Sequence, residues 1–386
     1  MTTLAPDPGV PSLGVYVHWP YCAKICPYCD FNVFKDRAGG EQPALARAIV
    51  ADLEAQAAIT GPRRLVSVFL GGGTPSLMDP AWAAEIVAAA RRLWAAAPDL
   101  EVTLEANPTD AEAARFEAFA AAGANRLSLG LQSLEDRALA FLGRNHDAAT
   151  AIRAAEAAAR AFPRLSVDLI YARPGQTPHA WAEELRRAIG LGAEHLSPYQ
   201  LTIEAGTAFD RAVKRGSLVP PDADAGAALF DTTQSVLQAQ GFEAYEVSNH
   251  ARGAAARSRH NLVYWRGLDY VGVGPGAHGR ITVDGVRQAT HAAARPADYI
   301  TRVGHAGVGF VDRQALSPVE AAEERLLSGL RITEGVAHAE VAALAIAPAK
   351  IAGLIELGLL ADDPERLRAT PAGRLVLDRL TTELAT

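Results

Sequence analysis

Every cysteine of the chain lies in one short stretch, Tyr16-Val-His-Trp-Pro-Tyr-Cys22-Ala-Lys-Ile-Cys26-Pro-Tyr-Cys29-Asp-Phe31. Three thiols this close together can occupy three corners of a soft-metal site and leave the fourth corner open for water, a substrate or another ligand. Zinc modules usually carry two separated ligand pairs, whereas Cys-x3-Cys-x2-Cys is a single asymmetric group. Two interpretations stay open: a zinc site completed by a histidine such as His18, or an iron–sulfur cluster with one iron free of protein ligands.

The composition is that of a folded globular chain. Of its 386 residues, 49% are hydrophobic and 21% are charged, which excludes disorder as the main state. No apolar run is long enough to span a bilayer, and Met1–Gly14 lacks the basic region and apolar core of a signal peptide, so we expect a cytoplasmic protein. The net charge of −7 argues against nucleic acid as a partner. Closely spaced cysteines with none left over suit a reducing compartment.

The first 206 residues alternate short β-branched or leucine-rich runs with alanine-rich helical patterns. Six strands are predicted, at Gly14–Trp19, Leu65–Leu70, Glu101–Ala106, Arg126–Gln132, Ser166–Tyr171 and His195–Leu201. The helices between them are predicted at Pro43–Ile59, Pro80–Ala97, Asp110–Ala122, Leu134–Leu142, Ala148–Phe162 and His179–Leu191. This alternation predicts an α/β fold, an incomplete (β/α)6 TIM-like barrel with its active residues at the carboxyl ends of the strands.

The pattern changes after residue 206, and we predict three domains: the partial barrel over 1–206, an α+β extension over 207–315 and a winged-helix-like domain over 316–386. In the extension we predict a helix at Asp222–Gln240, a strand at Phe242–Ser248, a loop from His250 to Asn261 and a hairpin around Asp284-Gly285. The last domain is predicted to contain helices at Pro318–Leu330, Ala339–Leu344 and Pro348–Leu357, a hairpin turning at Pro364, and a helix from Pro371.

The side chains and glycines that suggest chemistry follow the predicted strands. Gly71-Gly-Gly-Thr-Pro-Ser76 follows the second strand and lets backbone amides approach a ligand closely, although a tight turn into the helix near Pro80 explains the motif better when it is taken alone. Glu105, Gln132 and Asp168 belong to the third, fourth and fifth strands, and Arg144 lies near a helix end. Each of these residues alone has a structural explanation, such as capping a turn or a helix. Their convergence at one rim of a barrel favours a binding site.

Together these motifs resemble the radical S-adenosylmethionine (SAM) proteins related to oxygen-independent coproporphyrinogen III oxidase. The match runs from the cysteine stretch and Gly-Gly-Gly-Thr-Pro-Ser through Gly130-Leu-Gln-Ser133, Leu142-Gly-Arg-Asn-His146 and Pro174-Gly-Gln-Thr177, and it covers nearly the whole chain. The resemblance implies a [4Fe–4S] cluster on Cys22, Cys26 and Cys29, with SAM on the fourth iron. It also implies a SAM pocket lined by Tyr16, Gly72, Gly73, Thr74, Glu105, Gln132, Arg144 and Asp168.

Two details distinguish branches of this family. The coproporphyrinogen oxidases have a further cysteine at the end of the motif and a longer N-terminal extension, whereas here Asp30-Phe31 follows Cys29. Both departures resemble the HemW-like heme chaperones. His260-Asn-Leu-Val-Tyr-Trp265 is similar to a His-Asn-x-x-Tyr-Trp signature of that group, which implies that His260 binds heme, and a neutral imidazole suits an axial position. The structural alternative is a packed histidine beside core aromatic residues.

The resemblance therefore implies a heme chaperone that holds a [4Fe–4S] cluster, SAM and heme, and passes heme to respiratory proteins at the membrane, as a monomer or a homodimer. One alternative is an oxygen-independent coproporphyrinogen III dehydrogenase, which catalyses SAM-dependent oxidative decarboxylation. Another is an RNA-modifying radical SAM enzyme, suggested by Arg366, Arg368 and Arg374 near the C-terminus. His278, in Gly-Pro-Gly-Ala-His-Gly, is either a turn residue or a second polar group near the cofactor.

Overall fold

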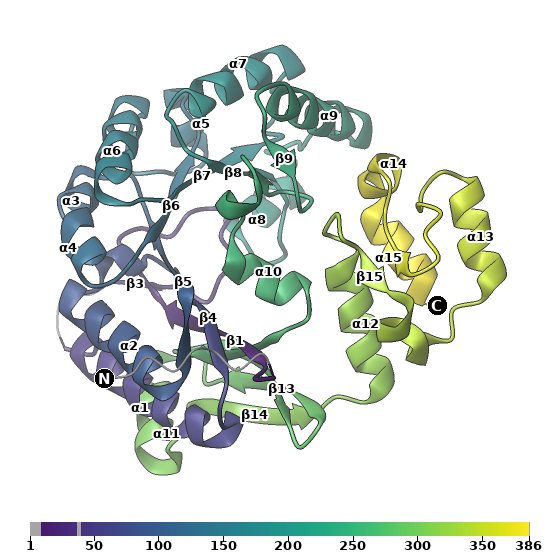
Figure 1. Ribbon diagram of the computed structural model, residues 1–386. Coiled ribbons are helices and arrows are strands. Elements are labelled where there is room, and N and C mark those ends of the chain that lie inside the picture. The colour runs from purple at the N-terminus through teal and green to yellow at the C-terminus, as the bar shows by residue number, and fades with distance from the viewer. Residues whose placement is uncertain (1–8, 37–39, 386) are drawn as a thin grey trace.

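The computed structural model describes residues 9–36 and 40–385, and Figure 1 shows how their elements are arranged. Most of Met1–Gly14, for which no signal peptide is predicted, lies outside the described residues. All six predicted strands are present: β1 (Ser12–Trp19), β4 (Arg64–Gly72), β5 (Ala95–Ala106), β6 (Arg126–Gln132), β7 (Leu165–Tyr171) and β8 (His195–Gln200). Each pairs in parallel with the next, which confirms the incomplete (β/α)6 barrel.

The helices between these strands lie close to the predicted ranges: α1 (Gln42–Thr60), α2 (Pro80–Leu93), α3 (Asp110–Ala113), α4 (Phe116–Ala121), α5 (Asp136–Phe141), α6 (Ala148–Ala161) and α7 (Pro178–Ile189). Asp79, Asp147 and Thr177 accept backbone hydrogen bonds in the first turns of α2, α6 and α7, which fixes where those helices begin. The predicted helix over Asp110–Ala122 is divided into α3 and α4. Helix α2 ends before Ala97 because the N–H of Ala95 donates to the carbonyl of Arg63 and starts β5.

The segment after β8 extends the same sheet at both edges. Its elements are α8 (Ala208–Lys214), α9 (Ala223–Ala239), β9 (Glu243–Ala244), β10 (His250–Ala251), α10 (Arg259–Trp265), β11 (Asp269–Val273), β12 (His278–Val283), β13 (Val286–Ala292), α11 (Pro296–Ala306) and β14 (Phe310–Ala315). The strand order is β14-β13-β12-β11-β1-β4-β5-β6-β7-β8-β10-β9. A boundary near residue 206 therefore cuts through one sheet, and the division into three domains stays a proposal.

Two predictions in this segment are wrong. Phe242–Ser248 is a strand only at β9, and His250–Asn261 is not a loop, because it contains β10, a 3-10 turn and the start of α10. Ser258 caps α10 by accepting a hydrogen bond from the N–H of Asn261. The hairpin around Asp284-Gly285 is confirmed, since β12 and β13 pair antiparallel on either side of it and both turn residues have positive φ.

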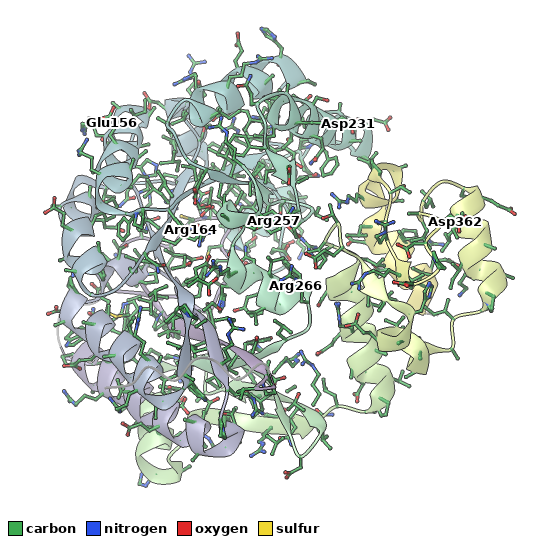
Figure 2. All side chains as sticks on the ribbon, viewed as in Figure 1. Glu156, Arg164, Asp231, Arg257, Arg266 and Asp362 are labelled. Carbon is green, nitrogen blue, oxygen red and sulfur yellow. The ribbon has the colours of Figure 1, made fainter. Side chains whose placement is uncertain are left out.

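The C-terminal elements lie beside the barrel in Figure 1 and have an apolar core of their own. They are α12 (Pro318–Gly329), β15 (Val336–Ala337), the 3-10 helix η3 (His338–Leu344), α13 (Pro348–Glu356), β16 (Arg366–Leu367), α14 (Pro371–Leu375) and α15 (Leu377–Ala385). The predicted helices and terminal hairpin are present, with Leu360 and Ala369 bridging its strands. Arg266, at the end of α10, reaches Glu334 across this junction with an Nε–Oε2 distance of 3.0 Å (Figure 2). No described helix has the length and apolar character needed to cross a membrane.

Candidate functional site

A cavity of about 1080 Å³ lies at the carboxyl ends of the barrel strands. Because parallel strands bring the segments that follow them to one edge of a sheet, residues from six separate motifs meet there. Ten of the predicted site residues line the cavity: Cys22, Cys26, Cys29, Gly72, Gly73, Thr74, Glu105, Gln132, Arg144 and Asp168. Tyr16 and His260 are not among its lining residues.

The cysteine loop is anchored through its backbone. The N–H groups of Gly73 and Thr74 donate to the carbonyls of Trp19 and Tyr21, both at 2.8 Å, which joins the glycine motif to the start of the loop. At the other side, the N–H of Phe209 in α8 donates to the carbonyl of Pro27 at 3.0 Å. The loop is therefore held from the barrel and from α8, so the three thiols are positioned before any cofactor binds.

The glycines of the motif are required by close packing under this loop. Gly72 has a φ of 109°, and a Cβ there would lie 2.6 Å from the His18 ring. A Cβ on Gly73 would lie 2.7 Å from the carbonyl oxygen of Tyr21. Both distances are shorter than real carbon contacts, so any larger residue would push the cysteine loop away from β4. The tight-turn explanation and the cofactor-binding explanation of this motif are thus compatible.

The three thiols face one cavity but are not arranged around a single ion. Among the described residues, no three His, Cys, Asp or Glu side chains lie close enough together to hold one metal ion. A tetrahedral zinc ion binds its sulfur ligands directly at about 2.3 Å, whereas a [4Fe–4S] cluster takes each cysteine on a separate iron atom. Burial raises the pKa of Cys22, and burial with the neighbouring thiols raises that of Cys29 to about 11, so cofactor binding has to displace their protons.

Arg144 connects the cysteine loop to the strand ends. One guanidinium nitrogen, Nη1, lies 3.3 Å from Cys26 Sγ, and Nη2 donates to the carbonyl of Gly130 at 3.1 Å and to the side chain of Asn107. Asn107 donates in turn to Thr74 Oγ1 at 3.0 Å. Asn107 is a site residue that the prediction missed, although it lies two positions after Glu105 in the same motif.

The floor of the cavity carries two carboxyl groups, Glu105 and Asp168. Glu105 Oε2 accepts a hydrogen bond from the N–H of Gly72 at 3.0 Å, and Asp168 Oδ2 accepts one from Ser128 at 2.9 Å. Burial, followed by the charge of Asp168, raises the pKa of Glu105 to about 8. Burial also raises the pKa of Asp168. Gln132 adds an amide from a backbone with a φ of 64°, a conformation in which residues other than glycine are uncommon.

The raised pKa of Glu105 predicts that the free energy of unfolding of the ligand-free protein falls as the pH rises. A carboxyl whose folded pKa lies above its unfolded value of 4.5 favours folding at low pH, and this contribution is lost as the pH rises through about 8. Glu105→Gln removes the buried charge and keeps an acceptor for Gly72. We expect its melting temperature, relative to wild type, to rise between pH 5 and about pH 8 and to level off at higher pH. Parallel curves for wild type and variant would contradict the assignment, and exposed Glu54→Gln serves as the control.

Tyr16 and His260 lie away from the cavity, with their ring centroids 6.3 Å apart. The Tyr16 hydroxyl pairs with His18 Nδ1 at 2.9 Å. His260 is 1% exposed, and its two ring nitrogens pair with the Ser67 hydroxyl at 2.9 Å and the Tyr264 hydroxyl at 2.7 Å. Burial lowers the pKa of His260 to about 3, so the ring is neutral. This arrangement matches the packed-histidine alternative in the folded state.

The wall of the cavity opposite the cysteines comes from β8, α9 and the C-terminal elements. Its exposed or partly exposed apolar side chains are Tyr199, Phe230, Leu375 and Val376. Arg374 lies among them, and its guanidinium has no hydrogen-bond or ion-pair partner among residues 9–36 and 40–385. No local pattern brings residue 374 close to residue 22, so the sequence alone gave no signal for this wall.

Comparison with known proteins defines the class. Residues 16–188 match the radical SAM superfamily, and residues 316–376 match the HemN C-terminal domain. The chain is 41% identical to the mitochondrial radical S-adenosyl methionine domain-containing protein 1 of Bos taurus, over 98% of this chain and 89% of that protein. It is 37% identical to the heme chaperone HemW of Mycobacterium tuberculosis, over 99% and 96%.

A solved structure supports the same fold. Coproporphyrinogen III oxidase (HemN) from Escherichia coli superposes with a TM-score of 0.79 over 98% of this chain and 91% of that one, at 21% identity. The fold and the cysteine site are those of a radical SAM protein. Within that class, the chain belongs to the family that contains HemW and the mitochondrial radical S-adenosyl methionine domain-containing protein 1.

Proposed function

We propose that the protein is a heme chaperone that holds a [4Fe–4S] cluster and SAM, binds heme and transfers it to acceptor proteins. The observation that carries this proposal is the match to heme chaperones HemW over nearly the full chain, together with Phe31 at the position where the oxidases have a further cysteine. The side chain of Phe31 is 63% exposed and lines the cavity. An exposed phenyl ring that lines the cavity suits a flat apolar ligand better than a polar, hydrated ligand.

The cofactor roles follow from the lining residues. Cys22, Cys26 and Cys29 would hold the cluster, whose fourth iron binds SAM. The backbone of Gly72 and Gly73, with the Thr74 side chain, would line the methionyl part of SAM, and Glu105 or Asp168 would take its amine or ribose hydroxyls. Gln132 and Arg144 would complete the pocket, Arg144 by facing the carboxylate. Tyr16 would act indirectly, because its hydroxyl fixes His18 beneath Gly72.

The cavity is large. Its volume of about 1080 Å³ exceeds the usual range for small-molecule sites, about 300–1,000 Å³. A heme is a large apolar plate with two carboxylates. Tyr199, Phe230, Leu375 and Val376 offer it apolar surface, and Arg374, which interacts with the charge of Glu246 but makes no side-chain hydrogen bond among the described residues, offers a cation to a carboxylate.

This placement predicts a role for Arg374. Arg374→Ala should weaken heme binding about tenfold or more, the value of one charge-assisted hydrogen bond of about 1.5–3 kcal/mol. Heme titration followed by absorbance measures the effect. Arg160→Ala, a change on the exposed face of α6, is the matched control and should bind heme as wild type does. Equal affinity in both variants would remove Arg374 from the proposal.

His260 is the second candidate contact with heme. Its ring is buried and both nitrogens are hydrogen-bonded, so iron could reach it only after α10 moves away from Ser67. Gly253 and Gly267, both at positive φ, flank this helix. His260→Ala tests the role: loss of heme binding without a change in the cluster would support it.

We further propose respiratory hemoproteins at the membrane surface as acceptors, a cytoplasmic location, and either a monomer or a homodimer as the working form. The RNA-modifying alternative is weakened because Arg366 donates to the carbonyls of Glu334 and Gly335, Arg368 pairs with Asp363 at 2.9 Å, and Arg374 faces the cavity. A nucleic-acid site needs free cations on one face.

The decisive experiment separates carrying heme from making a porphyrin. The chain is reconstituted anaerobically, titrated with heme and mixed with an apo-acceptor hemoprotein, while coproporphyrinogen and SAM turnover is assayed in the same samples. We expect heme binding and transfer without decarboxylation. If the protein decarboxylated coproporphyrinogen at a useful rate and transferred no heme, the chaperone proposal would be wrong and the coproporphyrinogen III dehydrogenase would be the better assignment.

A further inference from the structure

Two histidines outside the cavity form a stacked pair on the strands that extend the sheet. His278 begins β12 and lies opposite His291 in β13, with their ring centroids 4.3 Å apart and their planes 15° apart. His278 is exposed and His291 is half-buried. Within the described part of the chain, no ring nitrogen of either residue has a hydrogen-bond partner. These imidazoles are therefore accessible in the folded state, whereas His260 is not.

The histidine pair lies close to the residues that follow the cysteine loop, and one side chain connects the two regions. The side-chain amide of Asn32, three residues after Cys29, donates to the carbonyls of Pro275 at 2.9 Å and Ala294 at 2.8 Å. These two carbonyls lie three residues before His278 and three residues after His291. A Cβ on Gly276 would lie 2.5 Å from the same amide, so the contact is close. The Asn32 side chain therefore ties the two segments that flank the histidine pair to the end of the cysteine stretch.

The charges around the pair suit a cation. Asp312 in β14 is in register with His291, so its carboxylate lies on the same face of the sheet. Arg280, on the same face of β12 as His278, pairs with Glu324 at 2.6 Å, which offsets part of its positive charge. Burial, His291 and Arg280 lower the pKa of His278, which keeps its ring in the neutral form that binds metals.

We propose that His278 and His291 form a second metal-ligating site, which binds a metal centre through imidazole nitrogen. As cross-strand neighbours on adjacent strands, the two side chains are within reach of one ion once the exposed His278 ring rotates out of the stack and both nitrogen lone pairs turn toward the ion. The same chemistry would hold a divalent transition ion between both rings or the iron of a heme on one of them. Binding of heme iron at this pair rests on the proposed function, whereas binding of a divalent ion does not.

The first arm of the test uses Ni2+ as the probe. The full chain is reconstituted with its cluster and saturated with SAM, so that the thiolates are occupied, and it is titrated with Ni2+ by calorimetry. We expect one site whose affinity falls on the order of 100-fold in His278→Ala and in His291→Ala, because each leaves one ligand of a chelating pair. His305→Ala, which removes an exposed histidine from α11, should bind Ni2+ as wild type does.

The second arm uses ferric heme, followed by absorbance and electron paramagnetic resonance. A changed axial-ligand signal in His278→Ala or His291→Ala, but not in His305→Ala, assigns heme iron to the pair; a loss confined to the Ni2+ arm assigns a divalent ion. If both variants match wild type in both arms, the inference is wrong even though heme binding persists. If wild type binds no heme, the proposed function fails while the Ni2+ arm still decides the inference.

Discussion

Replacement of Glu101 by alanine is expected to lower the free energy of unfolding by about 3–5 kcal/mol, because it leaves a buried cation without its carboxylate. The Glu101 side chain is fully buried, and its Oε2 lies 2.7 Å from Nη1 of Arg164, which Figure 2 labels in the barrel body. The same carboxylate accepts hydrogen bonds from the N–H groups of Arg259 at 3.1 Å and His260 at 3.0 Å. Arg164 keeps Glu194 at 3.2 Å, so the buried cation left without a carboxylate is Arg126, which is 2% exposed and lies close enough to Glu101 to lower its pKa. The change also removes the anion at the start of α10. Denaturant unfolding measures the loss.

The pH dependence of this loss has a definite sign. Burial raises the pKa of Glu101, but Arg126, Arg164 and the two backbone N–H groups outweigh it, so the net shift is downward from 4.5. A lowered folded pKa stabilises the protein above the unfolded value, and this stabilisation is lost as the pH falls through the folded pKa. The difference in free energy of unfolding between wild type and Glu101→Ala should therefore be largest near pH 7 and should become smaller at acidic pH.

Glu54→Ala is the matched control for Glu101→Ala. Glu54 pairs with Arg92 at 2.7 Å, but both side chains are more than half exposed, and such pairs contribute about 0–1 kcal/mol. If Glu101→Ala costs no more than Glu54→Ala, the carboxylate does not hold α10 in place. A large cost together with weakened heme binding would link this helix, which carries His260, to the proposed function.

The strands of the barrel could be predicted because each is a short buried run whose neighbours lie nearby in sequence. The wrong predictions occur where the residue that stabilises an element lies far from it in the sequence. Ala95 has a high helix propensity, but it joins β5 because Arg63 and β4 offer it a ladder hydrogen bond. The start of α10 looked like a loop because its stabilising anion is Glu101, more than 150 positions earlier.

The site was predicted in part for a similar reason. Residues at or near the carboxyl ends of the parallel strands line one cavity, because those ends share an edge of the sheet. Tyr16 lies within β1, and its hydroxyl pairs with His18 instead of lining that cavity. Arg374 and the apolar wall around it come from α14, whose approach to the barrel depends on packing that no local pattern encodes.

Substitution of Cys22 by serine is expected to reduce iron and sulfide per chain at least about tenfold after anaerobic reconstitution. Cys22 is buried in the loop, where Thr74 Oγ1 donates to its sulfur at 3.6 Å, and the chain contains only two further cysteines. A serine hydroxyl stays protonated and is a harder ligand than a thiolate, so the third corner of the cluster would be lost. Iron and sulfide analysis, with zinc measured in the same samples, checks the outcome.

Phe31→Cys is the matched control for Cys22→Ser, because it adds a thiol to the same loop without removing a ligand. Phe31 is 63% exposed, so the fold should tolerate the change, and iron per chain should equal that of wild type. Full iron content in Cys22→Ser, or zinc in place of iron in wild type, would contradict the cluster. If Phe31→Cys also gained decarboxylation of coproporphyrinogen, this one position would separate the oxidases from the chaperones. We expect no such gain, since three thiolates already complete the cluster and a fourth leaves the apolar wall and Arg374 unchanged.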